Sequence, residues 1–515
     1  MNNDATTRSW ISKLPVAMTV TCLRPQINVN ENSDMNGRPK TCEVGGSTRT
    51  RISSQHGKHG MRTFDNFSPL LDAVQDRLTQ ECSEAIHVEA DRRSRLWPQA
   101  IGTELRTKRD QLVAKEPAYA AITDAMCERI GHAVMSVIIS GDTNDKTAKR
   151  IDDLQKSIAR AEKTASEGKT EAEIKAAEGK LAVLREELAE FEEGAGAGDK
   201  HKNLLALGGE FDVLVKLCTQ AMHDLVEETK SKKDAKTKGE TKTEEATILA
   251  IDRIVKAKCK TLQGSLTDAA SNGGQTVRLY RLLFGNMATT DYVSENRATL
   301  CRSHSFSVNA DSSHIDQLTA NDDLAYDFSK SKKGAGLMSE AEYATYQMFE
   351  FTSWNVRQFA KNLLAECPSF SPKEIGIVLE ETAAWLVRTL YYGGKGSRES
   401  RAPAYGAADT VVVTATMEQP VTPAAAFIRP VPLSPDMRGI AEARLADELA
   451  NYDAACGAPA RAALPLDRIN MAQSPISKVA LPFNLKDLQT WASTVVVGRS
   501  YSPVNGKAIH APASA

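Results

Sequence analysis

The amino-acid sequence predicts an α+β fold whose core is split by a long helical stretch. Segments rich in Val and Thr stand near both ends of the chain, VAMTVTCL at 16–23 and TVVVTATM at 410–417, and both read as strands. Between them, residues 65–142 place apolar side chains at helical spacing, as in FSPLLDAVQDRLTQ. Strands that flank a helical insertion fit a sheet built from distant parts of one chain.

Composition limits the class of protein. The 515 residues are 41% hydrophobic and 25% charged, with a formal net charge of −2. A sequence pI near 6.5 gives no global case for nucleic-acid binding, so such a site has to be local. Nine cysteines stand singly, without metal-ligand spacing, which suits reduced thiols. No signal sequence or membrane span is visible, so we expect a soluble, cytoplasmic protein with no cofactor and no membrane contact.

The next elements follow in order. Gly45-Gly46 opens the strand STRTRI, whose alternation puts Arg49 and Arg51 on one face, and Ser53, Ser54 and Gln55 are candidate helix N-caps. Residues 145–247 predict an antiparallel helical hairpin, with apolar seams at 151–165 and 174–191. Its last part, 227–244, alternates charges and is typical of a solvated linker.

The C-terminal part mixes both kinds of element. YATYQMFEFTSW (343–354) is strand-like, and Ser371-Pro372-Lys373-Glu374 caps a helix that runs through Val387. A glycine-rich turn at 391–396 precedes the strand at 410–417. The Pro- and Ala-rich residues 418–466 predict irregular structure, and LKDLQTW (485–491) predicts a last short helix.

One short segment concentrates positive charge. Residues 51–62, RISSQHGKHGMR, contain arginine, lysine and histidine but no carboxylate. A basic strand that ends at a helix start offers backbone N–H groups and the positive end of a helix dipole, which suit phosphate. Lys58 and Arg62 are four residues apart and share one helix face. On these residues alone, an ordinary basic surface stays the alternative to a polyanion site.

The wider segment 32–62 resembles the N-terminal signature of the Cas-seven family of CRISPR-associated proteins, the backbone proteins (CasC) of type I-E Cascade. The matching residues, in the family's order, are Asn32, Asp34, Gly37, Pro39, Lys40, Thr41, Gly45, Gly46, Arg51, Ser53, Ser54, Gln55, Lys58 and Arg62. Ser33, Met35, Gly57 and His59 depart from the pattern, replacing an arginine, an aspartate, an aromatic and a basic residue. Later blocks resemble the family in order: LLFGNMA (282–288), HIDQLTANDDL (314–324), GAGLMSEAEYATYQMFEF (334–351), Gly394-Lys395 and LKDLQTW.

This resemblance implies a right-hand shape with an RRM-like (ferredoxin-like) palm, large helical fingers and a protruding thumb hairpin. The implied boundaries are 14–64 and 300–417 for the split palm, 65–299 for the fingers with the hairpin insertion at 145–247, and 309–342 for the thumb. The irregular segment 418–466 and a C-terminal segment 467–515 have no assigned place in this plan.

The resemblance also implies a role: a crRNA-binding backbone subunit that polymerises along the spacer and presents it to target DNA, whose sequence is read by base pairing. The implied partners are crRNA, target DNA as an RNA–DNA heteroduplex, further copies of the chain, the large, small and end-capping Cascade subunits, and a recruited nuclease. Sequence-independent RNA binding requires contacts with the phosphates and sugars of the RNA. The residues expected to bind RNA are Lys40, Arg49, Arg51, Ser53, Gln55, Lys58, Arg62 and Lys395, with Met287 as an apolar wedge and Leu318 and Thr319 at the thumb kink.

Two other functions compete. Relatives in type III complexes cleave RNA with a metal and a loop aspartate, and Asp34, Asp316, Asp322 and Asp323 are candidates for that part. No paired-ligand spacing accompanies them, so we expect no enzyme. The other alternative is an interaction protein whose helical hairpin is its main working part.

Overall fold

The structure is a computed structural model that describes residues 2–83, 85–89, 91–94, 96–140, 205–234, 244–261, 266, 275–286, 297–320, 337–393 and 406–500. The chain divides into two compact units. The sheet unit comprises Met1–Val88, Gln275–Phe284 and Ala298–Ala515, and the helical unit comprises Glu89–Gly274 and Gly285–Arg297. No helix in the described part of the chain is long and apolar enough to cross a membrane.

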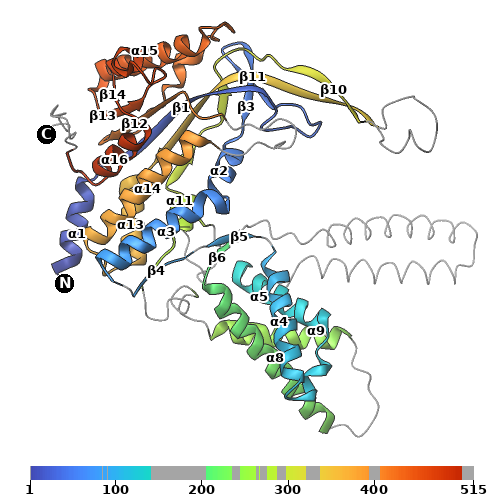
Figure 1. The fold of residues 1–515 in the computed structure, drawn as a ribbon. Coiled ribbons are helices and arrows are strands. Elements are labelled where there is room, and N and C mark those ends of the chain that lie inside the picture. The colour runs from blue at the N-terminus through green and yellow to red at the C-terminus, as the bar shows by residue number, and fades with distance from the viewer. Residues whose placement is uncertain are drawn as a thin grey trace, which may run out of the picture. The chain divides into compact units, whose positions relative to one another are not determined.

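The described residues of the sheet unit form a ten-stranded sheet in the order β14, β13, β12, β1, β11, β9, β3, β2, with β8 and β10 also paired to β11 (Figure 1). The strands are β1 (Ala17–Val29), β2 (Thr41–Val44), β3 (Ser47–Ile52), β8 (Leu300–Arg302), β9 (Ser305–Ser307), β10 (His314–Ala320), β11 (Leu337–Trp354), β12 (Thr410–Thr416), β13 (Ala460–Leu464) and β14 (Leu481–Pro482). All pairs are antiparallel except β13 with β14. The central strand β1 pairs with β12 as far as Leu23–Thr410, and Pro25 follows where only β11 remains as its neighbour.

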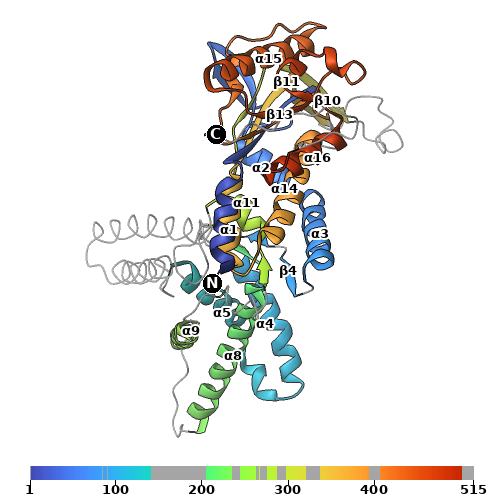
Figure 2. The same cartoon turned by 90° about the vertical axis from the view of Figure 1, so that its left-hand side faces the viewer.

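Helices cover both faces of this sheet (Figures 1 and 2). On one face lie α13 (Val356–Glu366) and α14 (Pro372–Tyr392), with α1 (Asn2–Lys13) and α16 (Leu485–Val496) packed along them. On the other face lie η2 (Pro423–Phe427), α15 (Met437–Cys456), η3 (Met471–Gln473) and η4 (Pro475–Lys478). Successive side chains of β1 point to opposite faces of the sheet, as in any strand. Cys22 faces the end of α14, and Leu23 belongs to the core beneath α15.

Local capping signals fix where the helices of the sheet unit begin. Ser371 and Glu374 form a capping box at the start of α14. Asn355 caps α13 and Asn484 caps α16, each by accepting a backbone N–H through its side chain. The predicted helix starts at 371 and 485 are therefore confirmed.

The rest of the sheet unit is a small layer around α2 (Ser54–Arg62) and α3 (Phe64–Glu81). Strand β4 (Ile86–Val88) pairs in parallel with β7 (Gln275–Val277), and α11 (Leu279–Phe284) follows β7. Phe67 of α3 lies 6.0 Å from the ring of Tyr280, 5.8 Å from Phe284 and 5.6 Å from Trp385. This aromatic cluster joins α3 to α11 and α14.

The helical unit has its own apolar core. Its elements are β5 (Arg92–Ser94), α4 (Trp97–Val113), η1 (Pro117–Ala121), α5 (Asp124–Ser140), β6 (Leu205–Leu207), α8 (Glu210–Asp234) and α9 (Glu244–Lys260). Ile101, Val134, Leu214 and Val255 are among the fully buried side chains that hold the helices together. Buried apolar area of this kind is what stabilises an isolated helical layer.

The predicted α+β class is confirmed, and the strands near 16–23, 47–52, 343–354 and 410–417 appear as β1, β3, β11 and β12. The expectation of irregular structure at 418–466 is wrong, because α15 and β13 lie within it. Alanine is the strongest helix former, so its abundance there favoured a helix.

The compact units also differ from the implied boundaries. The sheet unit keeps residues as far as Val88 as well as Gln275–Phe284, and it includes the segments after 417. Residues 227–234, interpreted as linker, continue helix α8. The seams at 151–165 and 174–191 lie outside the described residues.

Candidate nucleic-acid interface

The basic segment forms a strand, a turn and a helix. After β3, Ser53 caps α2: its Oγ accepts the His56 N–H at 3.2 Å. The Ser53 N–H donates to Asn32 Oδ1 at 3.0 Å, and the Ser54 N–H donates to His304 Nδ1 at 3.1 Å. The predicted cap is confirmed, but these amides already have partners within the protein. Phosphate binding here has to depend mainly on side chains.

Helix α2 has a glycine-lined buried face and a basic face. Gly57, Gly60 and Met61 are buried at the spacing of one helix side. Gln55 is exposed, whereas Lys40, Arg51, Ser53, Lys58 and Arg62 are half-buried. The guanidinium carbon of Arg62 lies 5.8 Å from the centre of the Phe284 ring. The structure thus brings most of the predicted RNA-contacting residues onto one short element and the residues beside it.

Arg49 is the exception. Its side chain is fully buried, and its guanidinium donates to the carbonyls of Ser307 at 2.9 Å and Val308 at 2.7 Å. It also donates to the carbonyls of Phe427 and Ile428. Burial lowers the pKa of Arg49 from its ordinary value. All of these donors are turned into the protein, which does not favour the predicted contact of Arg49 with RNA.

The structure also affects the charge of His56, a histidine of the basic segment. Burial lowers the pKa of His56, and the nearby charges of His59, Lys40 and Arg302 lower it further. His56 is therefore mainly neutral at pH 7. Lys40 and Arg302 therefore lie close enough to the first turn of α2 for their positive charges to act on His56.

Within the residues expected to form the thumb, β10 pairs with the first half of β11 in a two-stranded ribbon that projects from the sheet (Figure 1). Leu318 is half-buried and packs against Ala341 and Tyr343. Thr319 is exposed and stands directly opposite Met338, whose side chain is 71% exposed. Because neighbouring residues of a strand point to opposite faces, Leu318 and Thr319 cannot share one contact surface.

The exposed face of the ribbon carries apolar residues that the sequence interpretation missed. Ile315 is 61% exposed and lies on the same face as Thr319 and Met338. Exposed large apolar side chains on a projecting ribbon suit contact with nucleobases. The signal was present in the alternation of HIDQLTA, which separates Ile315 and Thr319 from Leu318.

Two of the expected contacts are not located. Met287 and Lys395 lie outside the described residues, so their predicted roles stay predictions. The described neighbours of Lys395 are the end of α14 at Tyr392, Gly393 with φ of 76°, and Gly406.

The aspartates considered for RNA cleavage do not form a metal site in the described part of the chain. Asp34 Oδ1 accepts the N–H groups of Asn36 at 2.8 Å and Arg38 at 2.9 Å, which is the role of a turn cap. Asp316 is exposed on β10, and Asp322 and Asp323 lie outside the described residues.

The one group of potential metal ligands among the described residues is Glu89, Asp91 and Glu210, in the helical unit. Backbone N–H groups already occupy part of this group: Gly209 donates to Glu89, and Gly208 donates to Glu210. None of these carboxylates belongs to the set of aspartates considered for cleavage.

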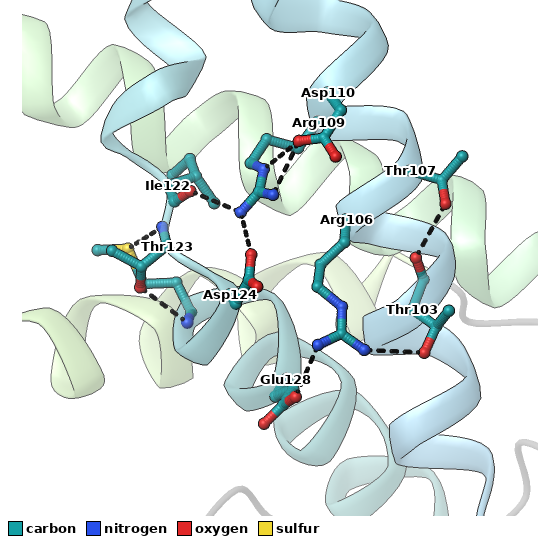
Figure 3. A network of polar contacts seen from close by, with 10 residues as sticks. Thr103, Arg106, Thr107, Arg109, Asp110, Ile122, Thr123, Asp124 and Glu128 are labelled. Carbon is teal, nitrogen blue, oxygen red and sulfur yellow. Dashed lines mark hydrogen bonds and ion pairs between the residues drawn. The ribbon is translucent and has the colours of Figure 1, made fainter.

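The arginines of α4 are engaged in ion pairs within the helical unit (Figure 3). Arg109 contacts Asp124 at 2.6 Å and Asp110 at 2.8 Å, and it donates to the Ile122 carbonyl. Arg106 contacts Glu128 at 3.0 Å. These contacts join α4 to the start of α5, so these arginines stabilise the helical layer.

The fold resembles that of chains in CRISPR complexes. A chain of a solved structure described as "CRISPR RNA-guided surveillance complex, pre-nicking" matches with a TM-score of 0.56 and 14% sequence identity, over 93% of this chain and 100% of that chain. A chain of a "CRISPR RNA-guided surveillance complex" matches with a TM-score of 0.48 and 13% identity, over 92% and 100%. The first likeness shows a shared fold.

Sequence comparison then gives the family. Residues 20–491 match the family of CT1975-like proteins, Cas_CT1975. The chain therefore belongs to this family of Cas proteins. No curated protein sequence matches it significantly.

Proposed function

We propose that this chain is the crRNA-binding backbone subunit of a type I, I-E-like Cascade surveillance complex. The observation that carries the proposal is the basic β3–α2 element, placed in a chain of this family and fold. A single strand of RNA held by phosphate contacts needs cations and polar groups but no base-reading side chains. Lys40, Arg51, Gln55, Lys58 and Arg62 supply them here.

The β10–β11 ribbon provides the second contact. Two exposed apolar side chains on one of its faces, Ile315 and Met338, separate neighbouring nucleotides, because apolar side chains favour contact with bases. Repeated along a filament of copies, this contact leaves the remaining bases free to pair with target DNA. The chain acts in this assembly as a scaffold and not as a nuclease.

Metal-dependent RNA cleavage of the type III kind is supported less well, since Asp34 already serves as a turn cap. Incubation of the purified complex with matched RNA and magnesium tests it, and regularly spaced cuts would overturn the scaffold proposal. The helical-hairpin interaction role concerns residues outside the described part of the chain. Deleting residues 150–192 tests this role. If the shortened chain still retains guide RNA, the hairpin is an addition to the RNA-binding part of the protein.

The main experiment is co-expression with the neighbouring genes of its operon, followed by extraction of bound RNA. We expect a discrete small RNA to co-purify with the wild-type chain. The triple variant Lys40→Gln, Lys58→Gln, Arg62→Gln is expected to lose most of it, because each neutralised phosphate contact contributes to affinity.

A matched control removes three charges elsewhere on the sheet unit. The control positions are three exposed lysines, Lys361 on α13, Lys478 on η4 and Lys486 on α16. All three are far from the β3–α2 element in the sequence. Their replacement by Gln is expected to leave guide RNA in place. Equal RNA content in the two triple variants would contradict the proposed interface.

A further inference from the structure

A buried carboxylate lies between two buried arginines under the basic helix. Glu350 of β11 contacts Arg24 of β1 through two bonds of 3.2 Å, and it contacts Arg302 of β8 at 3.2 Å. The side chains are 4%, 2% and 6% exposed, respectively. Charges buried this deeply persist only when they are paired with good geometry.

Glu350 is ionised in this arrangement. Burial alone would raise the pKa of its carboxyl, but the charges and hydrogen bonds of Arg24 and Arg302 hold it below the ordinary value. The carboxylate therefore holds both guanidinium groups at fixed positions. Thr352 assists by accepting a bond of 3.4 Å from Arg302.

The Arg302 side chain packs against helix α2 at Gly57. A Cβ atom added to Gly57 would lie 2.2 Å from Arg302 Nε and 2.9 Å from its Cδ, so only glycine lets α2 pack onto this side chain. Gly57 is one residue before Lys58, in the middle of the basic helix. Arg302 occupies the space that a side chain would need.

The Arg24 arm reaches another part of the sheet unit. Its Nη1 group donates to the carbonyl of Tyr391 at 2.8 Å and to that of Gly406 at 2.7 Å, and its Nη2 group donates to the Leu390 carbonyl. One guanidinium thus ties the end of α14 to the chain that leads into β12. These are the two described ends that flank 394–405.

From this geometry we propose that Glu350 is a positioning residue for RNA binding, which acts through Arg302 to set the place of α2 and its Lys58 and Arg62 side chains. This rests on the proposed function. Glu350 itself lies in the core and touches no RNA. With its charge removed, Arg302 loses its fixed partner, and the surface on which Gly57 packs shifts.

The test measures how RNA affinity depends on salt. The probe is single-stranded oligouridine, and the protein is the full chain. Each phosphate neutralised on a single strand contributes a slope of about −0.7 in the plot of log affinity against log salt. Glu350→Gln is expected to make the slope shallower by about 1.4, two phosphates at about 0.7 each, because both α2 cations are displaced. A smaller folded fraction changes apparent affinity but not this slope.

Two matched controls separate positioning from general damage. Glu442→Gln removes another buried carboxylate, which accepts bonds from Thr410 and the Leu466 N–H on the opposite sheet face, and we expect its slope to equal that of the wild type. Gly57→Ala is expected to reproduce the shallow slope. Gly439→Ala, where an added Cβ meets nothing within 4 Å, is expected to have no effect.

The outcomes distinguish the two proposals. If the wild-type chain binds oligouridine without salt dependence, the proposed RNA-binding function is wrong. If it binds with the expected dependence, but Glu350→Gln and Gly57→Ala both keep the wild-type slope, the positioning role of Glu350 is wrong and RNA binding stands.

Discussion

Replacing Glu31 by Gln should stabilise the sheet unit at neutral pH. Glu31 is buried at the end of β1, where Gln26 Nε2 approaches its Oε2 at 3.4 Å. Burial, and then the charge of Glu350, raise the pKa of Glu31 from 4.5 to about 8, against the opposing effect of Arg24 and Arg302. The folded protein therefore keeps this carboxyl protonated at pH 7, whereas the unfolded chain ionises it.

The sign and size follow from this difference. The stability linked to Glu31 is fully present below pH 4.5 and is lost as the pH rises toward 8, because unfolding releases a proton over that range. Each pH unit is worth about 1.4 kcal/mol, so ionisation favours the unfolded state by about 3 kcal/mol at pH 7. Glutamine matches the protonated carboxyl in shape and cannot ionise. Glu31→Gln should thus raise the free energy of unfolding by about 3 kcal/mol at pH 7 and by under about 1 kcal/mol at pH 5.

Urea unfolding followed by tryptophan fluorescence provides the assay. Four of the five tryptophans, Trp10, Trp354, Trp385 and Trp491, belong to the sheet unit, so the signal reports mainly on this unit. Glu442→Gln is the control and should destabilise, because glutamine replaces with an NH2 donor one of the two buried oxygens that accept from Thr410, the Leu466 N–H and Ser474. A Glu31→Gln variant that is no more stable at pH 7, or whose advantage does not shrink at pH 5, would refute the reasoning.

Three further predictions concern the interface. Arg49→Met should lower the free energy of unfolding by about 3–5 kcal/mol, because four carbonyls lose a charged donor, and the folded fraction should keep its guide RNA. Loss of RNA without loss of stability would instead make Arg49 an RNA contact. The double variant Ile315→Ser, Met338→Ser should change stability by under about 1 kcal/mol but reduce RNA retention, whereas Leu318→Ala should lower the melting temperature. If Leu318→Ala reduced RNA retention and the double variant did not, Leu318 would be the base contact. Affinity for oligouridine should rise several-fold from pH 8 to pH 6, because bound phosphate raises the lowered pKa of His56. His56→Gln should flatten this pH profile, and an unchanged profile in the variant would show that His56 is not the group responsible.

The parts of the fold that sequence could predict have local signals. Strand β1 follows from its Val and Thr content, and the start of α14 follows from Ser371 and Glu374, which lie within one helical turn. The cap at Ser53 is equally local. These elements appear in the structure at or near the predicted residues.

The parts that sequence could not predict depend on distant contacts. Arg49 has the residue type and strand position of an RNA contact, yet its carbonyl partners lie 258 to 379 residues further along the chain. Glu350 and Arg24 are 326 residues apart, and no pattern in either neighbourhood links them. For Leu318 and Thr319 the alternation can be read from the sequence, but the register with β11 determines which of the two packs against Ala341 and Tyr343.

The layer over β1, β11 and β12 has a consequence for how nucleotides can meet this protein. A simple RRM stacks two or three bases on aromatic side chains of its open sheet surface. Here aromatic residues of the sheet pack within the protein: Phe349 lies 5.4 Å from Phe306 and 5.3 Å from Phe427, which comes from the covering layer. For the RNA-binding role proposed above, this means that the covered sheet face offers no open aromatic surface on which bases could stack. RNA would then be held through its backbone, and such contacts do not depend on the sequence of the guide.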